Sequence, residues 1–226
     1  MKNNIDWDAV NQHVNTQIYS GVSGKLLKLT HKQLGAFGNE RQKPQSDVLE
    51  IGAGQGEHFS YVNKSFATYT MTDISDWGLT EILKISKLDP RITFESQDIQ
   101  ALTYPDNSFD RVITSCVLAH VDEPYESFLE VRRVTKNDGT CSFLVSADPG
   151  WLLRMIRTVL TKPKMKELEV PYLLMNAVSH RNSAHCVIEI AKHVFREDDL
   201  EIKYFPFRVK SWNLSTHIII NVKIRK

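Results

Sequence analysis

Between residues 47 and 146, short apolar runs alternate with segments of helical periodicity, and this alternation restricts the fold more than any other feature of the chain. Parallel strands need long crossover connections, usually helices, so the alternation is typical of an α/β protein with right-handed crossovers. The pattern predicts a mostly parallel sheet with helices on both faces. The first five strands are predicted at 47–51, 67–72, 91–96, 110–116 and 140–146.

Two β-rich runs, LEIKYFPF and LSTHIIINVKI, close the sequence and are joined by a short connection. A short connection predicts an antiparallel hairpin, here at one edge of the sheet. A nicotinamide-binding domain would instead continue its βαβ winding at this point. The sequence therefore predicts a seven-stranded sheet, mostly parallel, that ends in a C-terminal antiparallel hairpin.

The chain has 226 residues, of which 42% are hydrophobic and 24% are charged, a balance typical of a globular protein. A chain of this length buries roughly 70% of its unfolded surface, so a core needs neither a disulfide nor a metal. We expect a single domain over 1–226, with the GAFGNERQKPQS stretch as a loop. Its predicted parts are an N-terminal helical cap at 1–40, a core at 47–146, a helical insert at 149–182 and a C-terminal helix with strands at 183–226.

The charges and cysteines narrow the class of protein further. The 28 Lys and Arg residues against 27 Asp and Glu give a net charge of +1, which provides no general attraction for nucleic acid. The three cysteines are widely spaced without a C-x-x-C pair, so we expect reduced thiols and no metal site. The N-terminus lacks an apolar signal region, and no run approaches the roughly 18 apolar residues that span a bilayer. We expect a cytoplasmic protein, either a monomer or a homodimer.

A glycine-rich turn, VLEIGAGQGEH at residues 48–58, follows the first predicted strand and opens a helix. Glycines let the backbone adopt left-handed turns and approach a ligand closely. The spacing is G-x-G-x-G, and not the G-x-G-x-x-G that is typical of a pyrophosphate-binding turn. Glu50, just before the turn, would be poorly placed beside a pyrophosphate, and it suits a cationic or zwitterionic ligand.

Four motifs in order, VLEIGAGQG, MTDIS, SQDIQALTYPDNSFDRV and SCVLAHVDEP, resemble those of the class I S-adenosylmethionine-dependent methyltransferases. The likeness covers residues 47–146 and is greatest to the broad type 11 group, which acts on small molecules. It implies a Rossmann-like fold and S-adenosylmethionine as the cofactor. In this interpretation Glu50 supports the loop and the methionine end of the cofactor, which passes above the turn residues Gly52, Ala53, Gly54 and Gly56.

The same resemblance assigns five further residues to the cofactor. Asp73 would accept hydrogen bonds from both ribose hydroxyls, with Ile74 beside the adenine. Asp98 would lie near the adenine amino group, Ile99 would offer backbone contacts, and Ser115 would lie at the mouth of the fourth strand. Each also has a purely structural interpretation, since a glycine turn, a surface aspartate or a core-to-loop serine is common without a ligand.

Candidate catalytic residues follow the fourth strand and the helical insert. His120 could act as a general base near neutral pH, or it could only buttress its loop. His180 and His185 are also candidates, although their five-residue separation does not suit joint metal binding on one helix face. Arg181, between them, could clamp an acidic substrate or belong to a solvated helix start. Tyr19 could close over the methionine end as a lid, or pack between helices.

Residues 151–166, WLLRMIRTVLTKPKMK, combine five basic side chains with no acid. Helical spacing predicts one apolar stripe, made by Leu152, Met155, Ile156, Val159 and Leu160. The segment is either a lid helix over the active-site mouth with its charges in water, or a surface for a phosphate-bearing acceptor or an anionic membrane. The sequence does not separate these alternatives.

The sequence as a whole predicts an enzyme that transfers a methyl group from S-adenosylmethionine to an oxygen or nitrogen of a small molecule, such as a sugar, a lipid headgroup or a secondary metabolite. The protein mainly has to align the acceptor and exclude water. A base is required only if the acceptor arrives protonated. The alternatives are a non-catalytic cofactor-binding module of the same fold and, less favoured by the glycine spacing, a nicotinamide-dependent oxidoreductase.

Overall fold

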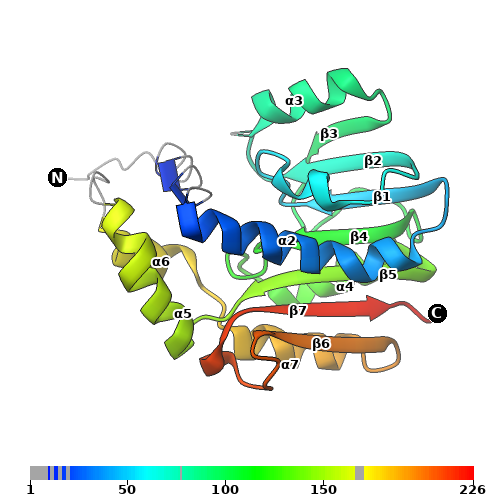
Figure 1. Cartoon of the computed structure of the whole chain (residues 1–226). Helices are drawn as coiled ribbons and strands as arrows, with labels where there is room; N and C mark the ends of the chain where they lie inside the picture. Colours follow the sequence, from blue (N-terminus) through cyan, green and yellow to red (C-terminus); the bar gives the residue numbers. More distant parts are fainter. Residues whose placement is uncertain (1–9, 11–12, 15–16, 19–20, 77, 166–170) are drawn as a thin grey trace.

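The computed structural model describes residues 10, 13–14, 17–18, 21–76, 78–165 and 171–226, and within them the chain forms a seven-stranded sheet in the order β3-β2-β1-β4-β5-β7-β6 (Figure 1). β1 to β5 pair in parallel, and β7 is antiparallel to both β5 and β6. This confirms the predicted fold class, including the terminal hairpin. The strands are β1 Ser46–Ile51, β2 Phe66–Asp73, β3 Ile92–Ser96, β4 Phe109–Ser115, β5 Thr135–Ser146, β6 Asp199–Pro206 and β7 Ser215–Lys223.

Helices cover both faces of the sheet. On one face, buried side chains of α4 (Pro124–Val134) and α7 (Ala184–Val194) pack against β1, β4, β5 and β7. On the other face, α2 (Gly21–Arg41) and α3 (Leu79–Leu88) share a core with β1 and β2. α4 begins with a proline, which suits the first helical turn, and the Ser183 hydroxyl caps α7 by accepting from the backbone N–H of Cys186.

α2 continues through part of the stretch that the sequence predicts to be a loop, and it ends only at Arg41. Two glycines explain the difference, because both occur where the helix closely approaches another part of the molecule. A Cβ on Gly38 would lie 2.3 Å from Nε of Arg111, and one on Gly35 would lie 2.7 Å from the carbonyl oxygen of Tyr61. These glycines therefore serve close helix packing, and not a turn.

The helical insert lies to one side of the sheet and contains α5 (Trp151–Ile156), a π-helical turn at Arg157–Thr161, a 3₁₀ turn at Lys162–Met165 and α6 (Tyr172–Ser179). The prediction that one apolar stripe forms the buried face of this segment is wrong. Met155 and Val159 are exposed, at 44% and 64%, whereas Leu153, Thr161 and Met165 are buried. The π-helical turn adds a residue per turn, so the buried positions no longer follow the regular helical spacing.

Two further elements complete the described structure, the 3₁₀ turns η1 (Glu57–Tyr61) and η4 (Trp212–Leu214). Of the residues described, no helix is both long and apolar enough to cross a membrane. The predicted lid residue Tyr19 lies outside the described residues.

Candidate active site

The glycine turn lies at the carboxyl edge of the sheet, directly after β1. Gly52, Gly54 and Gly56 have φ angles of +71°, +55° and +80°, in the left-handed region that favours glycine. The backbone N–H of Gly54 donates to Oδ2 of Asp73, at the end of β2, over 3.0 Å. The turn and the second motif are therefore joined where ligands of open α/β sheets bind. Ala53, within the turn, is buried.

Glu50 lies beneath this turn, with only 1% of its surface exposed. The Tyr69 hydroxyl donates to Glu50 Oε2 over 2.5 Å, and burial raises the pKa of Glu50 to about 7. The carboxyl group is thus enclosed in the protein and has no open side toward a ligand. This position is compatible with support of the turn, and contact of Glu50 with the methionine end of the cofactor stays a prediction.

Asp73 and Ile74 form the part of the edge best suited to a nucleoside. Asp73 accepts from the N–H groups of Gly54 and Ser75, at 3.0 and 3.2 Å, and an ionised carboxylate offers about four acceptor positions. Two positions therefore stay available for the hydroxyls of a ribose. Ile74 is 71% exposed beside it, as an apolar surface for a flat base. These residues fit the adenosine part of S-adenosylmethionine.

The remaining predicted cofactor residues follow β3 and β4. Asp98 accepts from the backbone N–H of Gln100 at 2.9 Å and from its side-chain amide at 3.1 Å, so it orders its own loop. Ile99 has its side chain in the core, which leaves only its backbone for a ligand, as predicted for a backbone contact. Ser115 is half-buried at the end of β4. Contact of these three residues with the cofactor stays a prediction.

The loop after β4 packs directly against the glycine turn. A Cβ on Gly52 would lie 2.1 Å from Cγ2 of Val117, so only glycine permits this approach. The insert is fastened to the same loop, because the N–H groups of Arg181 and Asn182 both donate to the carbonyl oxygen of Ala119, at 2.8 and 3.2 Å. The Asn182 side-chain amide adds donations to Leu118 and Val121. Residues far apart in sequence thus meet at the glycine turn.

Two of the predicted catalytic residues, His120 and His180, are brought together here. The rings of His120 and His180 lie 4.8 Å apart at an interplanar angle of 82°. His180 Nδ1 lies 2.6 Å from Asp148 Oδ2, and the other carboxylate oxygen accepts from Arg157 over 2.5 Å. His120 Nδ1 lies 2.9 Å from the carbonyl oxygen of Ser179. The result is a chain of contacts from Arg157 through Asp148 and His180 to His120.

Electrostatics keep this chain of contacts in one protonation pattern. Burial would raise the pKa of Asp148, but the hydrogen bond from His180 and the charge of Arg157 outweigh it and lower the pKa to about 2. Desolvation and the nearby His180 lower the pKa of His120 to about 4. Asp148 is therefore ionised at neutral pH.

Asp148 and Arg157 are functional candidates that the sequence interpretation missed. Asp148 follows β5 directly, and an acid at the carboxyl end of a parallel strand is the signal that could have identified it. Arg157 counts among the basic charges of the segment 151–166, but its side chain is only 17% exposed and is paired. His185 lies elsewhere, against the ring of Trp212 at 5.1 Å, and Arg181 forms an ion pair with Asp122.

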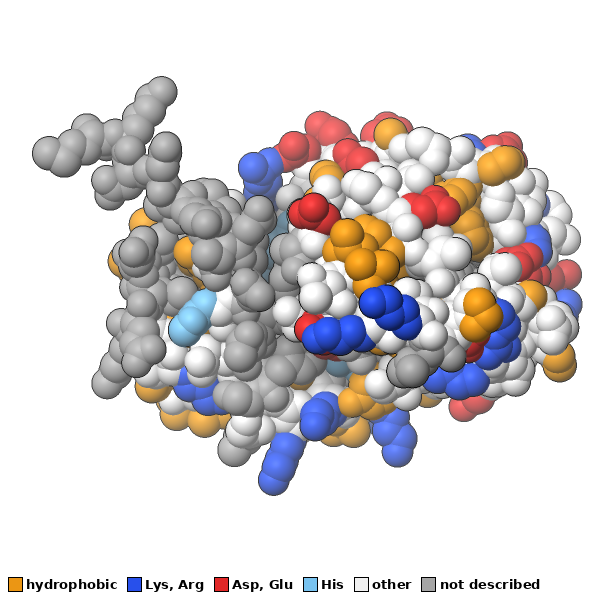
Figure 2. All heavy atoms as spheres, turned by 90° about the horizontal axis from the view of Figure 1, so that it is seen from above, with side chains coloured by type: hydrophobic (Ala, Val, Ile, Leu, Met, Phe, Trp, Pro, Cys, Tyr) orange, Lys and Arg blue, Asp and Glu red, His pale blue; other side chains and the backbone are white. Residues whose placement is uncertain are grey.

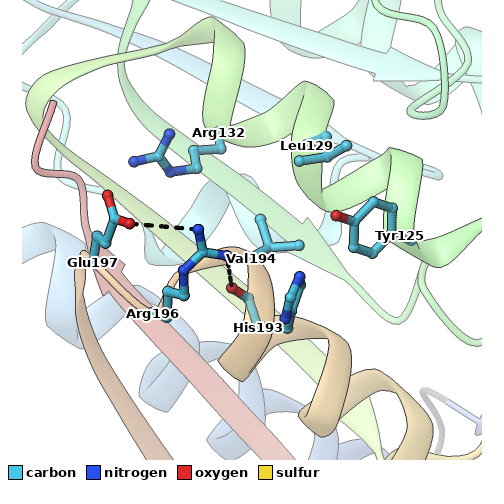
Figure 3. Close-up of a pocket in the computed structure, with 7 residues that line it drawn as sticks. All are labelled: Tyr125, Leu129, Arg132, His193, Val194, Arg196 and Glu197. Carbon is cyan, nitrogen blue, oxygen red and sulfur yellow. Dashed lines mark hydrogen bonds and ion pairs between the residues drawn. The ribbon is translucent and has the colours of Figure 1, made fainter.

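A separate groove of about 260 Å³ lies between α4 and α7 (Figure 3). It is lined by Tyr125, Leu129, Arg132, His193, Val194, Arg196 and Glu197. Its charged groups are satisfied locally, since Arg132 pairs with Asp198 and Arg196 with Glu197. None of the predicted site residues lines it, so we do not assign catalysis to this groove.

Comparisons with known proteins agree with this geometry. Residues 49–143 match the family model described as a methyltransferase domain. Demethylmenaquinone methyltransferase of Renibacterium salmoninarum is 31% identical over 171 residues, which are 76% of this chain and 65% of that protein. The polyketide synthase-nonribosomal peptide synthetase phmA of Phaeosphaeria nodorum is 32% identical over 130 residues, which are 48% of this chain and only 3% of that much longer protein.

Solved structures show the same fold. N-methyltransferase NodS of Bradyrhizobium japonicum WM9 superposes with a TM-score of 0.61 at 13% identity, over 88% of this chain and 96% of that one. The parallel sheet closed by a reversed hairpin is therefore a fold that this chain shares with solved methyltransferases. The chain carries a methyltransferase domain over residues 49–143, with the fold of S-adenosylmethionine-dependent methyltransferases. This sets aside the oxidoreductase alternative.

Proposed function

We propose that this chain transfers the methyl group of S-adenosylmethionine to a hydroxyl oxygen of a small molecule, with His180 as the general base. When bound, the cofactor supplies a methyl group on a sulfonium, whose departure needs no acid. The observation that carries the proposal is the 2.6 Å contact of His180 with an ionised Asp148, at the edge of the sheet where the glycine turn lies.

The hydrogen-bond partners determine which ring nitrogen is free. An ionised carboxylate only accepts, so His180 Nδ1 carries the proton and donates to Asp148. Nε2 then holds the lone pair that can remove a proton from an acceptor. The carbonyl of Ser179 likewise requires a proton on Nδ1 of His120. In the neutral form of either ring, Nε2 therefore holds the lone pair.

Proton transfer to His180 would create an imidazolium beside the Asp148 carboxylate. The carboxylate stabilises that charge and also fixes the orientation of the ring, while Arg157 keeps the carboxylate ionised. A neutral amine already has a lone pair and needs no base, whereas a hydroxyl must lose its proton as the oxygen–methyl bond forms. The pair therefore favours an oxygen acceptor over a nitrogen acceptor.

The test compares His180→Ala with His185→Ala, since His185 is an exposed histidine of the same segment, outside the cluster. Turnover is followed as S-adenosylhomocysteine formed with a panel of hydroxyl and amine acceptors. We expect the loss of a general base to lower kcat by about 10² to 10⁴ for hydroxyl acceptors. His185→Ala should keep full activity.

Asp148→Asn is the second test variant, because it removes the negative charge of the carboxylate and keeps the shape of the side chain. We expect kcat to fall and the affinity for S-adenosylhomocysteine, measured by calorimetric titration, to stay unchanged. Cofactor binding without turnover of any acceptor would instead support the non-catalytic module. Full hydroxyl methylation by both His180→Ala and Asp148→Asn would contradict the base assignment.

A further inference from the structure

Exposed large hydrophobic side chains occur on several elements of the described structure, among them Leu173, Leu174 and Val178 on α6. Of the large hydrophobic side chains that are exposed among the described residues, six lie on α5 with the turn after it and on the connection from β6 to β7. They are Trp151 (60% exposed), Met155 (44%), Val159 (64%), Phe207 (63%), Val209 (48%) and Leu214 (42%). Six exposed apolar side chains on two neighbouring segments form a candidate interaction surface.

The two segments are neighbours in space, at the start of α5 (Figure 1). A Cβ on Gly150 would lie 2.3 Å from the carbonyl oxygen of Trp212, so the insert begins directly on the β6–β7 connection. Trp151 and Met155, four residues apart, lie on one side of α5, and Val159 is exposed on the π-helical turn that follows it. We call these two segments, 151–165 and 205–216, the basic apolar face.

Charge on the basic apolar face has one sign. Neither 151–165 nor 205–216 contains an Asp or Glu, whereas Arg154, Lys162, Arg208 and Lys210 are all exposed. The face of α3 and β3, seen from above in Figure 2, mixes acidic and basic side chains instead. Because the net charge of the protein is only +1, this positive charge is a property of the local surface and not of the whole molecule.

We propose that the basic apolar face docks this protein on an anionic lipid membrane. A bilayer with anionic headgroups complements both properties at once, since Lys and Arg meet the headgroups while Trp, Phe and Val enter the acyl boundary. A second copy of the chain through the same face would bring like charges together, which opposes association. An acidic protein would match the charges but not the protruding apolar side chains.

Docking there brings the membrane next to the acceptor side of the site. Asp148 lies three residues before Trp151, and Arg157 joins the same helix to that carboxylate. The acceptor would then be a lipid-soluble hydroxyl compound that reaches His180 from the bilayer. This last step rests on the proposed function, whereas the docking itself does not.

The test uses the full chain and measures flotation with vesicles of phosphatidylcholine, with and without phosphatidylglycerol. We expect flotation only when phosphatidylglycerol is present, and less of it as NaCl is raised, because salt screens the attraction. Arg208→Gln with Lys210→Gln should weaken vesicle binding about 25-fold, at about five-fold per charge. The matched control, Lys84→Gln with Lys87→Gln on α3, removes the same charge elsewhere and should not change it.

The apolar part is tested separately. Val159→Ser should reduce flotation, and Leu83→Ser on α3, also an exposed residue at 45%, should not. Anionic vesicles should shift the emission of the wild-type protein to shorter wavelength, and Trp151→Phe should reduce that shift, since Trp212 of the same face remains. A titration with S-adenosylhomocysteine should give the same affinity for every variant, which separates this test from the test of the methyl-transfer site.

Absence of flotation with phosphatidylglycerol vesicles would overturn the proposal and leave an acidic protein as the partner to consider. Equal flotation with neutral and anionic vesicles would overturn it as well. The same holds if the α3 variants weaken binding as much as the variants of the basic apolar face do. Loss of methyl transfer with vesicle binding intact would bear only on the proposed function.

Discussion

The backbone N–H of Gly54 donates to Oδ2 of Asp73 over 3.0 Å, so the glycine turn after β1 and the acid at the end of β2 form one unit. The carboxylate both fixes the turn and keeps acceptor positions for a ligand. Because the turn follows β1 and Asp73 ends β2, and these strands pair in parallel, the sheet brings the two residues to the same edge. Cofactor binding and loop shape are therefore coupled at this point.

Asp73→Ala is expected to weaken S-adenosylhomocysteine binding by about two orders of magnitude or more. Each lost hydrogen bond from a ribose hydroxyl to the charged carboxylate contributes roughly 1.5 to 3 kcal/mol. Calorimetric titration measures the affinity, and circular dichroism checks that the fold is kept. Asp76→Ala removes an exposed acid three residues away and serves as control. Equal affinity of the Asp73→Ala variant and the wild type would disprove the ribose assignment.

Gly54→Val is expected to abolish cofactor binding. Gly54 has a φ of +55°, which a β-branched residue adopts only with strain, and its N–H is the donor to Asp73. The added side chain would also occupy the surface over which the cofactor passes. A titration that finds binding retained would show that the turn faces elsewhere.

The strands and the order of the motifs were predictable because periodicity and glycine spacing are local properties of the sequence. β1 to β4 begin and end within one or two residues of the prediction. β5 begins at Thr135, five residues earlier than predicted, because it enters the sheet through a bulge at which the register with β4 shifts. The irregular backbone there includes Asp138 at a φ of +60°.

The parts that could not be predicted depend on contacts between distant residues. Residue 38 is a glycine within a helix because the guanidinium of Arg111, on β4, occupies the space that a side chain at position 38 would need. The pairing of Asp148 with His180 joins residues 32 positions apart, and nothing in the local pattern relates them. Likewise, the π-helical turn at Arg157–Thr161 changes which side of the insert is buried. The acceptor side of the site depends mainly on such contacts between residues that are distant in sequence.

Gly38→Ala is expected to destabilise the protein, although alanine has a higher helix propensity than glycine. Alanine in a helix is favoured over glycine by about 1 kcal/mol, so propensity alone predicts a gain. The new Cβ would meet the guanidinium of Arg111, a fully buried side chain that donates to Asn39 at 2.7 Å and to Gln42 at 2.8 Å. Overpacking of this kind costs about 1 to 3 kcal/mol.

Urea denaturation measures the sign of this change in the free energy of unfolding. Ala36→Gly, at an exposed position two residues earlier in α2, is the matched control and should cost about 1 kcal/mol from propensity alone. A Gly38→Ala variant more stable than the wild type would mean that α2 is not held against the sheet by Arg111.

The stability of the protein should fall steeply as the pH is lowered from 6.5 toward 4. Burial lowers the pKa of His31 and His217 to about 4, and burial with the neighbouring His31 lowers that of His58 still further. Below pH 6.5 the unfolded chain therefore binds protons that these three folded histidines do not, which favours unfolding. Burial raises the pKa of Glu50 to about 7, so its contribution has the opposite sign between pH 4.5 and 7.

With His120, whose pKa is also lowered to about 4, four histidines against one carboxyl group leave an uptake of about three protons on unfolding near pH 5.5. Each proton changes the free energy of unfolding by about 1.4 kcal/mol per pH unit, so we expect a loss of roughly 3 to 4 kcal/mol per unit. Urea denaturation between pH 7 and pH 5 measures this slope. His58→Asn should flatten it by about one proton, whereas His193→Gln, at an exposed position of α7, should leave it unchanged. A slope near zero for the wild type would show that these histidines do not stay neutral in the folded protein.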